Sequence, residues 1–184
     1  AKVRKLGLLK EDVVMSNALL DMDSKCGSLE KSRKLFETLL IRSVVSWSSL
    51  IAGYALRGES NRVFGLLKTM CDKDIAPDEV TFLNVLSACT HGGLIDEGLQ
   101  LIVLMTEKYG IIRTIEHYVT MLDLFGRAGH FEKAVEVIKR IPSDGNIHIW
   151  LALLGACEKW GNKELGRSVF DHLTCFDNKL ETIA

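Results

Sequence analysis

Residues 44–78 read VVSWSSLIAGYALRGESNRVFGLLKTMCDKDIAPD and contain two short amphipathic segments. In the first segment the apolar residues recur with the i, i+3, i+4 spacing of one helix face: Trp47, Leu50, Ile51, Tyr54 and Ala55. Gly58 follows, and glycine readily adopts the left-handed conformation in which helices end. The second segment also has one apolar face and stops before Pro77, which cannot continue a helix. The stretch therefore predicts a helical hairpin.

The same hairpin pattern recurs along the chain and is marked by one glycine in each unit. Successive glycines are separated by 31, 35, 36 and 32 residues, at Gly27, Gly58, Gly93, Gly129 and Gly161. An apolar pair stands shortly before each glycine, and a second apolar pair stands shortly after it. An internal period of this size indicates a solenoid, in which each unit buries its apolar face against its neighbours.

The composition agrees with an all-α protein of moderate charge. The chain has 184 residues, of which 47% are hydrophobic, and only two are proline. No segment alternates polar and apolar residues in the way that a strand does. The formal net charge of −1 argues against a strongly basic nucleic-acid binder, although a local basic groove stays compatible with it. Uninterrupted apolar runs are too short to cross a bilayer, so we expect no membrane partner.

The titratable residues show no pattern typical of a catalytic or metal site. The five cysteines include no CxxC pair, and the five histidines are scattered without an HExxH or HxE motif. We interpret the cysteines as structural thiols in a reducing compartment. The sequence thus predicts no metal, no cofactor and no enzymatic activity of this chain by itself.

The repeat register divides the chain into successive units. Residues 1–12 are interpreted as the tail of a preceding repeat, and residues 181–184 as the start of a truncated further unit. Four complete repeats are expected between them, at residues 13–43, 44–78, 79–114 and 115–146. A fifth hairpin is expected at residues 147–180.

Several segments resemble plant pentatricopeptide-repeat proteins of the class with alternating repeat lengths. They are NALLDMDSKCGSLEKSRKLF, VVSWSSLIAGYALRG, IAPDEVTFLNVLSACTHGGLIDEG, IEHYVTMLDLFGRAGHFEKAVEVI and IWLALLGACEKWGNKELG. The last of these is similar to the extension motif that follows the repeats in that class. The resemblance covers essentially the whole chain. It implies a right-handed α-solenoid that binds single-stranded RNA in mitochondria or chloroplasts, often to select cytidines for editing, although no transit peptide is visible.

The resemblance also assigns base-contacting roles to particular residues. The second residue of each repeat packs against a base, which implies this role for Val14, Val45 and Val80. The fifth and last residues of a repeat read the base edge together, which implies the pairs Asn17 with Ser43 and Ser48 with Asp78. A small hydroxyl residue with aspartate favours guanine, and asparagine with serine favours a pyrimidine, cytosine first.

The third and fourth repeats are expected to read poorly, because Leu83 and Val119 stand at their fifth positions. A purely structural interpretation also stays open for the reading residues. Asn17 and Ser48 can be ordinary polar residues of a first helical turn, and Asp78 can cap the next helix. The basic residues of the second helices can form a solvated face: Lys31, Arg33, Lys34, Lys133, Lys139 and Arg140.

Three hypotheses follow for the function. The preferred one is an RNA-reading part of an organellar editing or processing factor, with a deaminase domain or other editing factors acting in trans. The chain lacks the HxE and CxxC motifs of the zinc deaminase that ends many members of the class. The second hypothesis is a protein-binding solenoid of the tetratricopeptide type, which the unequal repeat lengths disfavour. The third is a degenerate relic of the first.

Overall fold

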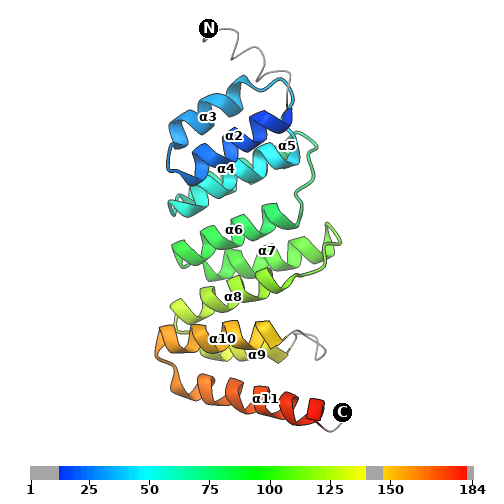
Figure 1. The fold of residues 1–184 in the computed structure, drawn as a ribbon. Coiled ribbons are helices and arrows are strands. Elements are labelled where there is room, and N and C mark those ends of the chain that lie inside the picture. Colours follow the sequence, from blue (N-terminus) through cyan, green and yellow to red (C-terminus); the bar gives the residue numbers. More distant parts are fainter. Residues whose placement is uncertain (1–12, 140–146, 182–184) are drawn as a thin grey trace.

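The computed structural model describes residues 13–139 and 147–181, and every regular element in these ranges is an α-helix. The helices form hairpins that stack in chain order from the amino-terminal to the carboxy-terminal end (Figure 1). The first helices of the hairpins are α2 (Val13–Lys25), α4 (Val44–Leu56), α6 (Glu79–Gly92), α8 (Ile115–Arg127) and α10 (Ile147–Trp160). The second helices are α3 (Leu29–Thr38), α5 (Ser60–Asp72), α7 (Ile95–Glu107), α9 (Phe131–Lys139) and α11 (Lys163–Glu181).

The packing has the two-layer pattern of a solenoid. Each first helix packs against the next one, so that α2, α4, α6, α8 and α10 make a continuous layer. Each second helix packs on its own first helix, and α3, α5 and α7 also contact the first helix of the following hairpin. The chain is therefore an all-α solenoid, as the periodicity predicts.

The apolar pairs of the repeat pattern form the core between the two layers. Both members of the pair before each glycine are buried in the second, third and fourth hairpins: Leu50 and Ile51, Val85 and Leu86, Met121 and Leu122. A small residue allows close approach between α7 and α8, since a Cβ added to Gly98 would lie 2.5 Å from the Leu124 Cδ2 atom. The periodic glycines all have positive φ, at Gly27, Gly58, Gly93, Gly129 and Gly161. They end the first helices, as expected.

Parts of the predicted division fall outside the described residues. These parts are the amino-terminal segment 1–12, the connection at 140–146 and residues 182–184. Helix α11 continues to Glu181, one residue beyond the expected end of the fifth hairpin. Within the described ranges, none of the helices is both long enough and apolar enough to cross a membrane.

Candidate nucleic-acid interface

Helices α2, α4 and α6 share a groove with a volume of about 600 Å³. Six of the seven residues with predicted base-contacting roles line it: Val14, Asn17, Val45, Ser48, Asp78 and Val80. The seventh, Ser43, lies beside it and accepts a hydrogen bond of 3.2 Å from the Asn17 Nδ2 atom. The remaining lining residues are Ala18, Asp21, Lys25, Ser49, Ala52 and Asn84. Stacking of the repeats thus brings together residues that are far apart in sequence.

The three valines of the groove expose apolar surface to solvent. Val14 is 80% exposed, Val45 is 54% exposed and Val80 is 49% exposed. Each is the second residue of its helix, so the spacing of the repeats places them in a row. Compact apolar side chains held in water at regular intervals can pack against flat ring faces.

Ser48 and Asp78 are joined through a third residue, Thr81. The Ser48 Oγ atom lies 2.6 Å from the Thr81 Oγ1 atom, and Thr81 Oγ1 donates to Asp78 Oδ1 over 2.6 Å. The backbone N–H of Thr81 also donates to Asp78 Oδ1 over 2.8 Å, so Asp78 is the N-cap of α6. The capping role that the sequence left open for Asp78 is therefore present, in the same side chain that lines the groove.

Counting hydroxyl hydrogens fixes the polarity of this chain of contacts. Thr81 has one hydroxyl hydrogen, which it gives to Asp78, so Ser48 must donate its own hydrogen to Thr81. What Ser48 and Asp78 retain is acceptor capacity. The contacts of Asp78 with Thr81 use Oδ1, and Ser48 keeps an unused lone pair. This pair is suited to a partner that presents N–H donors.

The pair Asn17 and Ser43 has a matching arrangement one repeat earlier. Asn17 Nδ2 donates to Ser43 Oγ, and Ser46 Oγ donates to Asn17 Oδ1 over 2.6 Å. Ser43 caps α4 in a capping box with Ser46, just as Asp78 caps α6 with Thr81. The Asn17 amide has a second N–H and a second lone pair, so it can offer both a donor and an acceptor.

His117 occupies the corresponding bridging position at the next junction. The backbone N–H of Thr114 donates to His117 Nδ1 over 3.2 Å, and Nε2 lies 3.0 Å from the carbonyl oxygen of Glu79. These partners require a neutral ring with its hydrogen on Nε2. Burial lowers the pKa of His117, which is consistent with the neutral form. Leu83 stands at the fifth position and has no polar side-chain atom.

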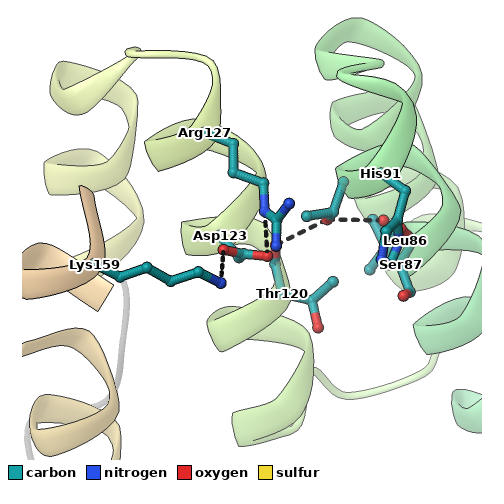
Figure 2. A network of polar contacts seen from close by, with 8 residues as sticks. Leu86, Ser87, His91, Thr120, Asp123, Arg127 and Lys159 are labelled. Carbon is teal, nitrogen blue, oxygen red and sulfur yellow. Dashed lines mark hydrogen bonds and ion pairs between the residues drawn. The ribbon is translucent and has the colours of Figure 1, made fainter. Parts of the chain in front are cut away.

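A row of basic residues runs along the carboxy-terminal ends of the first helices. Twelve positions after the first residue of its helix stand Lys25 in α2, His91 in α6, Arg127 in α8 and Lys159 in α10. In α4 this position is Leu56. Asp123 bridges two members of the row, because Arg127 Nε lies 2.8 Å from its Oδ2 and Lys159 Nζ lies 3.8 Å from its Oδ1 (Figure 2). Lys25 pairs likewise with Asp21 at 2.8 Å, so each of the three permanent cations of the row has a carboxylate partner.

Sequence reasoning missed the bridging residues and the basic row. Ser46 and Thr81 lie three positions after Ser43 and Asp78, which is the spacing of a capping box and was available as a signal. The basic row appears only when the helix starts are aligned.

Two cysteines of the described residues, Cys89 and Cys157, are buried in the apolar core. Burial raises the pKa of Cys89 to about 12, and the side chain has no exposed surface. Nowhere in residues 13–139 and 147–181 do three or more histidine, cysteine or acidic side chains gather in a way that could hold a metal ion.

Comparison with known families gives the same assignment as the repeat geometry. A family model described as "PPR repeat family" matches residues 42–91, and one described as "PPR repeat" matches residues 80–109 and 116–146. A pentatricopeptide repeat-containing protein of Arabidopsis thaliana is 42% identical over 159 residues. The chain belongs to the pentatricopeptide-repeat family.

Other Arabidopsis relatives carry an organelle in their names. One named mitochondrial is 36% identical over 164 residues, and one named chloroplastic is 37% identical over 166 residues. The match to the first relative covers 86% of this chain but 22% of that protein. The match to the mitochondrial relative covers 89% of this chain and 35% of that protein. The match to the chloroplastic relative covers 90% of this chain and 19% of that protein. The pentatricopeptide-repeat array described here thus spans a minor part of the curated relatives it matches.

Solved structures support the fold of the array. The pentatricopeptide repeat protein PPR10 from maize superposes with a TM-score of 0.75 at 24% identity, covering 88% of this chain and 24% of PPR10. PPR10 in complex with an 18-nucleotide psaJ RNA element gives a TM-score of 0.71 at 22% identity, covering 89% of this chain and 28% of that one. At these identities the likeness concerns the fold of the stacked hairpins.

Proposed function

We propose that this pentatricopeptide-repeat array binds single-stranded RNA sequence-specifically through the groove of α2, α4 and α6. The observation that carries the proposal is the regular alternation in that groove of exposed valines with polar pairs from successive repeats. Unstacked bases present both flat faces and hydrogen-bonding edges, and a repeat protein can offer one slot per repeat. The complex of PPR10 with an RNA element is a precedent on the same fold.

Each slot has the chemistry that one base requires. Val45, Ser48 and Val80 all line the groove, and we infer that the two valines enclose a ring between them. Ser48 and Asp78 then accept from its edge, and guanine presents N–H donors on its pairing edge. In the preceding slot, Val14 and Val45 enclose a base whose edge meets Asn17, with Ser43 holding the amide. The donor and acceptor of Asn17 suit a pyrimidine.

The basic row extends the same proposal to the RNA backbone. Lys25 lines the groove beside the first slot, and Arg127 and Lys159 hold the equivalent position further along the stack. Phosphates that follow the bases from slot to slot would meet these cations. Asp21 partly neutralises Lys25, Asp123 partly neutralises Arg127 and Lys159, and two slots have complete polar pairs. We therefore expect this chain alone to bind RNA weakly and with a clear salt dependence.

The proposed role is target selection in an organelle. Relatives named mitochondrial and chloroplastic support an organellar location. We propose that this array selects the site of RNA editing or processing, and that a deaminase domain or other editing factors carry out the reaction. The chain itself is not proposed to be an enzyme.

A binding titration tests the function directly. The chain is titrated against labelled single-stranded RNA pools with one position fixed at a time, and against a matched pool of unstructured peptides. We expect RNA binding that weakens with added salt and prefers a guanine next to a pyrimidine. Equal binding to all RNA pools, or binding to peptides alone, would contradict the proposal.

A further inference from the structure

Asn84 is a polar residue of the groove that belongs to neither reading pair. It is the sixth residue of α6 and is half-buried. It lines the groove together with Ser48, Asp78 and Val80, whereas Leu83, the fifth residue of the same helix, does not. The third repeat therefore presents an amide to the groove from the position next to its apolar fifth residue.

A hydrogen bond between α6 and α4 fixes the Asn84 amide. Its Nδ2 atom donates to the backbone carbonyl oxygen of Ser48 over 3.2 Å. A carbonyl oxygen can only accept, so the amide cannot be reversed with Oδ1 in that place. Nδ2 has two hydrogens, and no other side-chain hydrogen bond of Asn84 is present among the described residues. One amide hydrogen is therefore left, on a side chain that is anchored beside Ser48.

This amide has no equivalent at the other junctions. The sixth residues of the other first helices are Ala18, Ser49, Thr120 and Ala152. Of these, Thr120 does not bond to the preceding helix through its hydroxyl, because its Oγ1 donates to the Glu116 carbonyl of its own helix over 2.7 Å. The amide therefore stands at the sixth position only at the junction where Ser48 and Asp78 meet.

A guanine in this slot needs a donor that the reading pair lacks. Its pairing edge carries hydrogens on N1 and N2, and also a carbonyl oxygen, O6, that accepts. Ser48 gives its hydroxyl hydrogen to Thr81, and Asp78 is a carboxylate, so neither can donate to O6. An acceptor that leaves water without finding a donor is unfavourable. The spare amide hydrogen of Asn84 is a donor of the required kind in the same groove.

We propose that Asn84 is a third base-reading residue of this slot and donates its second amide hydrogen to the O6 atom of guanine. Ser48 and Asp78 accept from the N1 and N2 hydrogens of the same base. Adenine carries an amino group where guanine has O6, and two facing N–H groups repel, so Asn84 should disfavour adenine. The inference rests on the proposed binding of RNA in this groove and states which group of the base Asn84 recognises.

Modified bases in a short RNA separate this contact from the other two. The whole chain is titrated at low salt with fluorescein-labelled oligouridines that carry one central guanosine, inosine or 2-aminopurine nucleoside, and fluorescence anisotropy reports binding. Inosine retains O6 and the N1 hydrogen but lacks the 2-amino group, whereas 2-aminopurine retains the amino group but lacks O6 and the N1 hydrogen. Asn84→Ala removes the donor and suits a helix. Asn61→Ala is the matched control, because Asn61 is exposed on α5 and does not line the groove.

The parent protein should bind the guanosine oligomer more tightly than the other two. Asn84→Ala should weaken binding of the guanosine and inosine oligomers about fivefold, the ratio that one net hydrogen bond gives, and should leave binding of the 2-aminopurine oligomer unchanged. Asn61→Ala should change none of the three. An equal loss for all three oligomers would show that Asn84 only positions Ser48, and it would overturn the inference while the proposed function stands.

Asn84→Asp provides a second variant with the same shape and an acceptor in place of the donor. It should lower the ratio of guanosine to 2-aminopurine affinity further than Asn84→Ala does, and circular dichroism checks that both variants are folded. A guanosine preference that survives both substitutions would overturn the inference alone. A parent protein that does not distinguish the guanosine oligomer from plain oligouridine would overturn the guanine slot of the proposed function and this inference with it.

Discussion

The Oγ atom of Ser48 lies 2.6 Å from the Oγ1 atom of Thr81, although the two residues are 33 positions apart and belong to successive repeats. This contact connects the fifth residue of one repeat to the cap of the next helix, where Thr81 binds Asp78. A base that meets Ser48 and Asp78 would therefore meet a pair whose geometry depends on the stacking of two hairpins. The proposed base preference would therefore be linked to inter-repeat packing through one hydroxyl group.

Thr81→Val should remove that link while keeping the shape of the side chain. The Ser48 hydroxyl and the Asp78 carboxylate each lose a hydrogen-bond partner, so we expect the free energy of unfolding to fall by about 1 kcal/mol. The preference for guanine at this slot should also decline. Urea unfolding and RNA titration measure the two effects. Thr90→Val is the matched control, because Thr90 has a buried hydroxyl on the same helix that donates to backbone carbonyls. A decline in guanine preference with Thr90→Val alone would contradict the link.

Asp78→Asn should change the preferred base from guanine towards adenine. An amide can donate where a carboxylate can only accept, and asparagine caps helices nearly as well as aspartate, so stability should change little. The preference should shift by on the order of 1 kcal/mol at one nucleotide, the scale of a single net hydrogen bond. RNA pools varied at one position measure the shift, best in a longer repeat array. An unchanged preference in a folded protein would contradict the reading role of Asp78.

Ser48→Asn should instead move the preference at the same slot towards uracil. Asparagine is longer than serine and carries both a donor and an acceptor, so it can reach a pyrimidine edge. The first repeat shows that the fold accommodates the change, because Asn17 holds the same position there and bonds to Ser43 and Ser46. The same pools measure it, with the slot of Asn17 as an internal reference. A shift at the reference slot, or none at either, would count against the assignment.

The sequence alone was sufficient to predict the stacked hairpins, their turn glycines and the residues that meet in the groove. The hairpins and the glycines follow from periodicity, since five copies of one pattern reinforce each other, whereas the residues of the groove were implied by the resemblance to pentatricopeptide repeats. The periodicity did not predict how the polar groups are connected, since Thr81 belongs to the repeat after the one it serves. Ser28 stands at the N-cap of α3, a position that favours serine, but its side chain makes no capping hydrogen bond.

A second cavity, which α4 forms with α3 and α5 and which Arg33, Arg42 and Trp47 line, could not be predicted from the repeat pattern because it arises where copies differ. Arg42 precedes the cap of α4, but a buried Pro77 precedes the cap of α6. At the next junction Tyr109, from the loop after α7, packs near Phe82 of α6 with the ring centres 5.5 Å apart. Arg33 was expected to belong to a solvated face, and it lines this pocket while pairing with Glu37 at 2.9 Å.

The stability of the chain should depend on pH through His117. Burial lowers the pKa of this side chain below its ordinary value of 6.5, so the folded state keeps it neutral while the unfolded state takes up a proton first. Its contribution is therefore complete above pH 6.5 and is lost as the pH falls towards the lower folded value. Urea unfolding from neutral to mildly acidic pH measures the loss.

His117→Ser gives the test its control. At the equivalent position of α4, Ser46 forms a capping box with Ser43. A serine at position 117 should therefore maintain the start of α8 without a titratable group. We expect the variant to lose less stability than the parent over the acidic interval. An identical pH dependence in both proteins would show that other groups cause it.

Gly126→Ala should destabilise the junction between the fourth repeat and the last hairpin. A Cβ on Gly126 in α8 would lie 2.3 Å from the Cδ2 atom of the Trp160 ring at the end of α10. The ring cannot retreat as a flexible side chain would, so we expect a loss of about 1–3 kcal/mol, the usual cost of overpacking. Urea unfolding measures the loss. Gly155→Ala, in α10, is the control, because a Cβ there meets no atom within 4 Å.

The double variant with Trp160→Leu should lose less than the sum of the two single losses, because the smaller side chain relieves the contact. Additive losses would show that glycine is needed here for another reason.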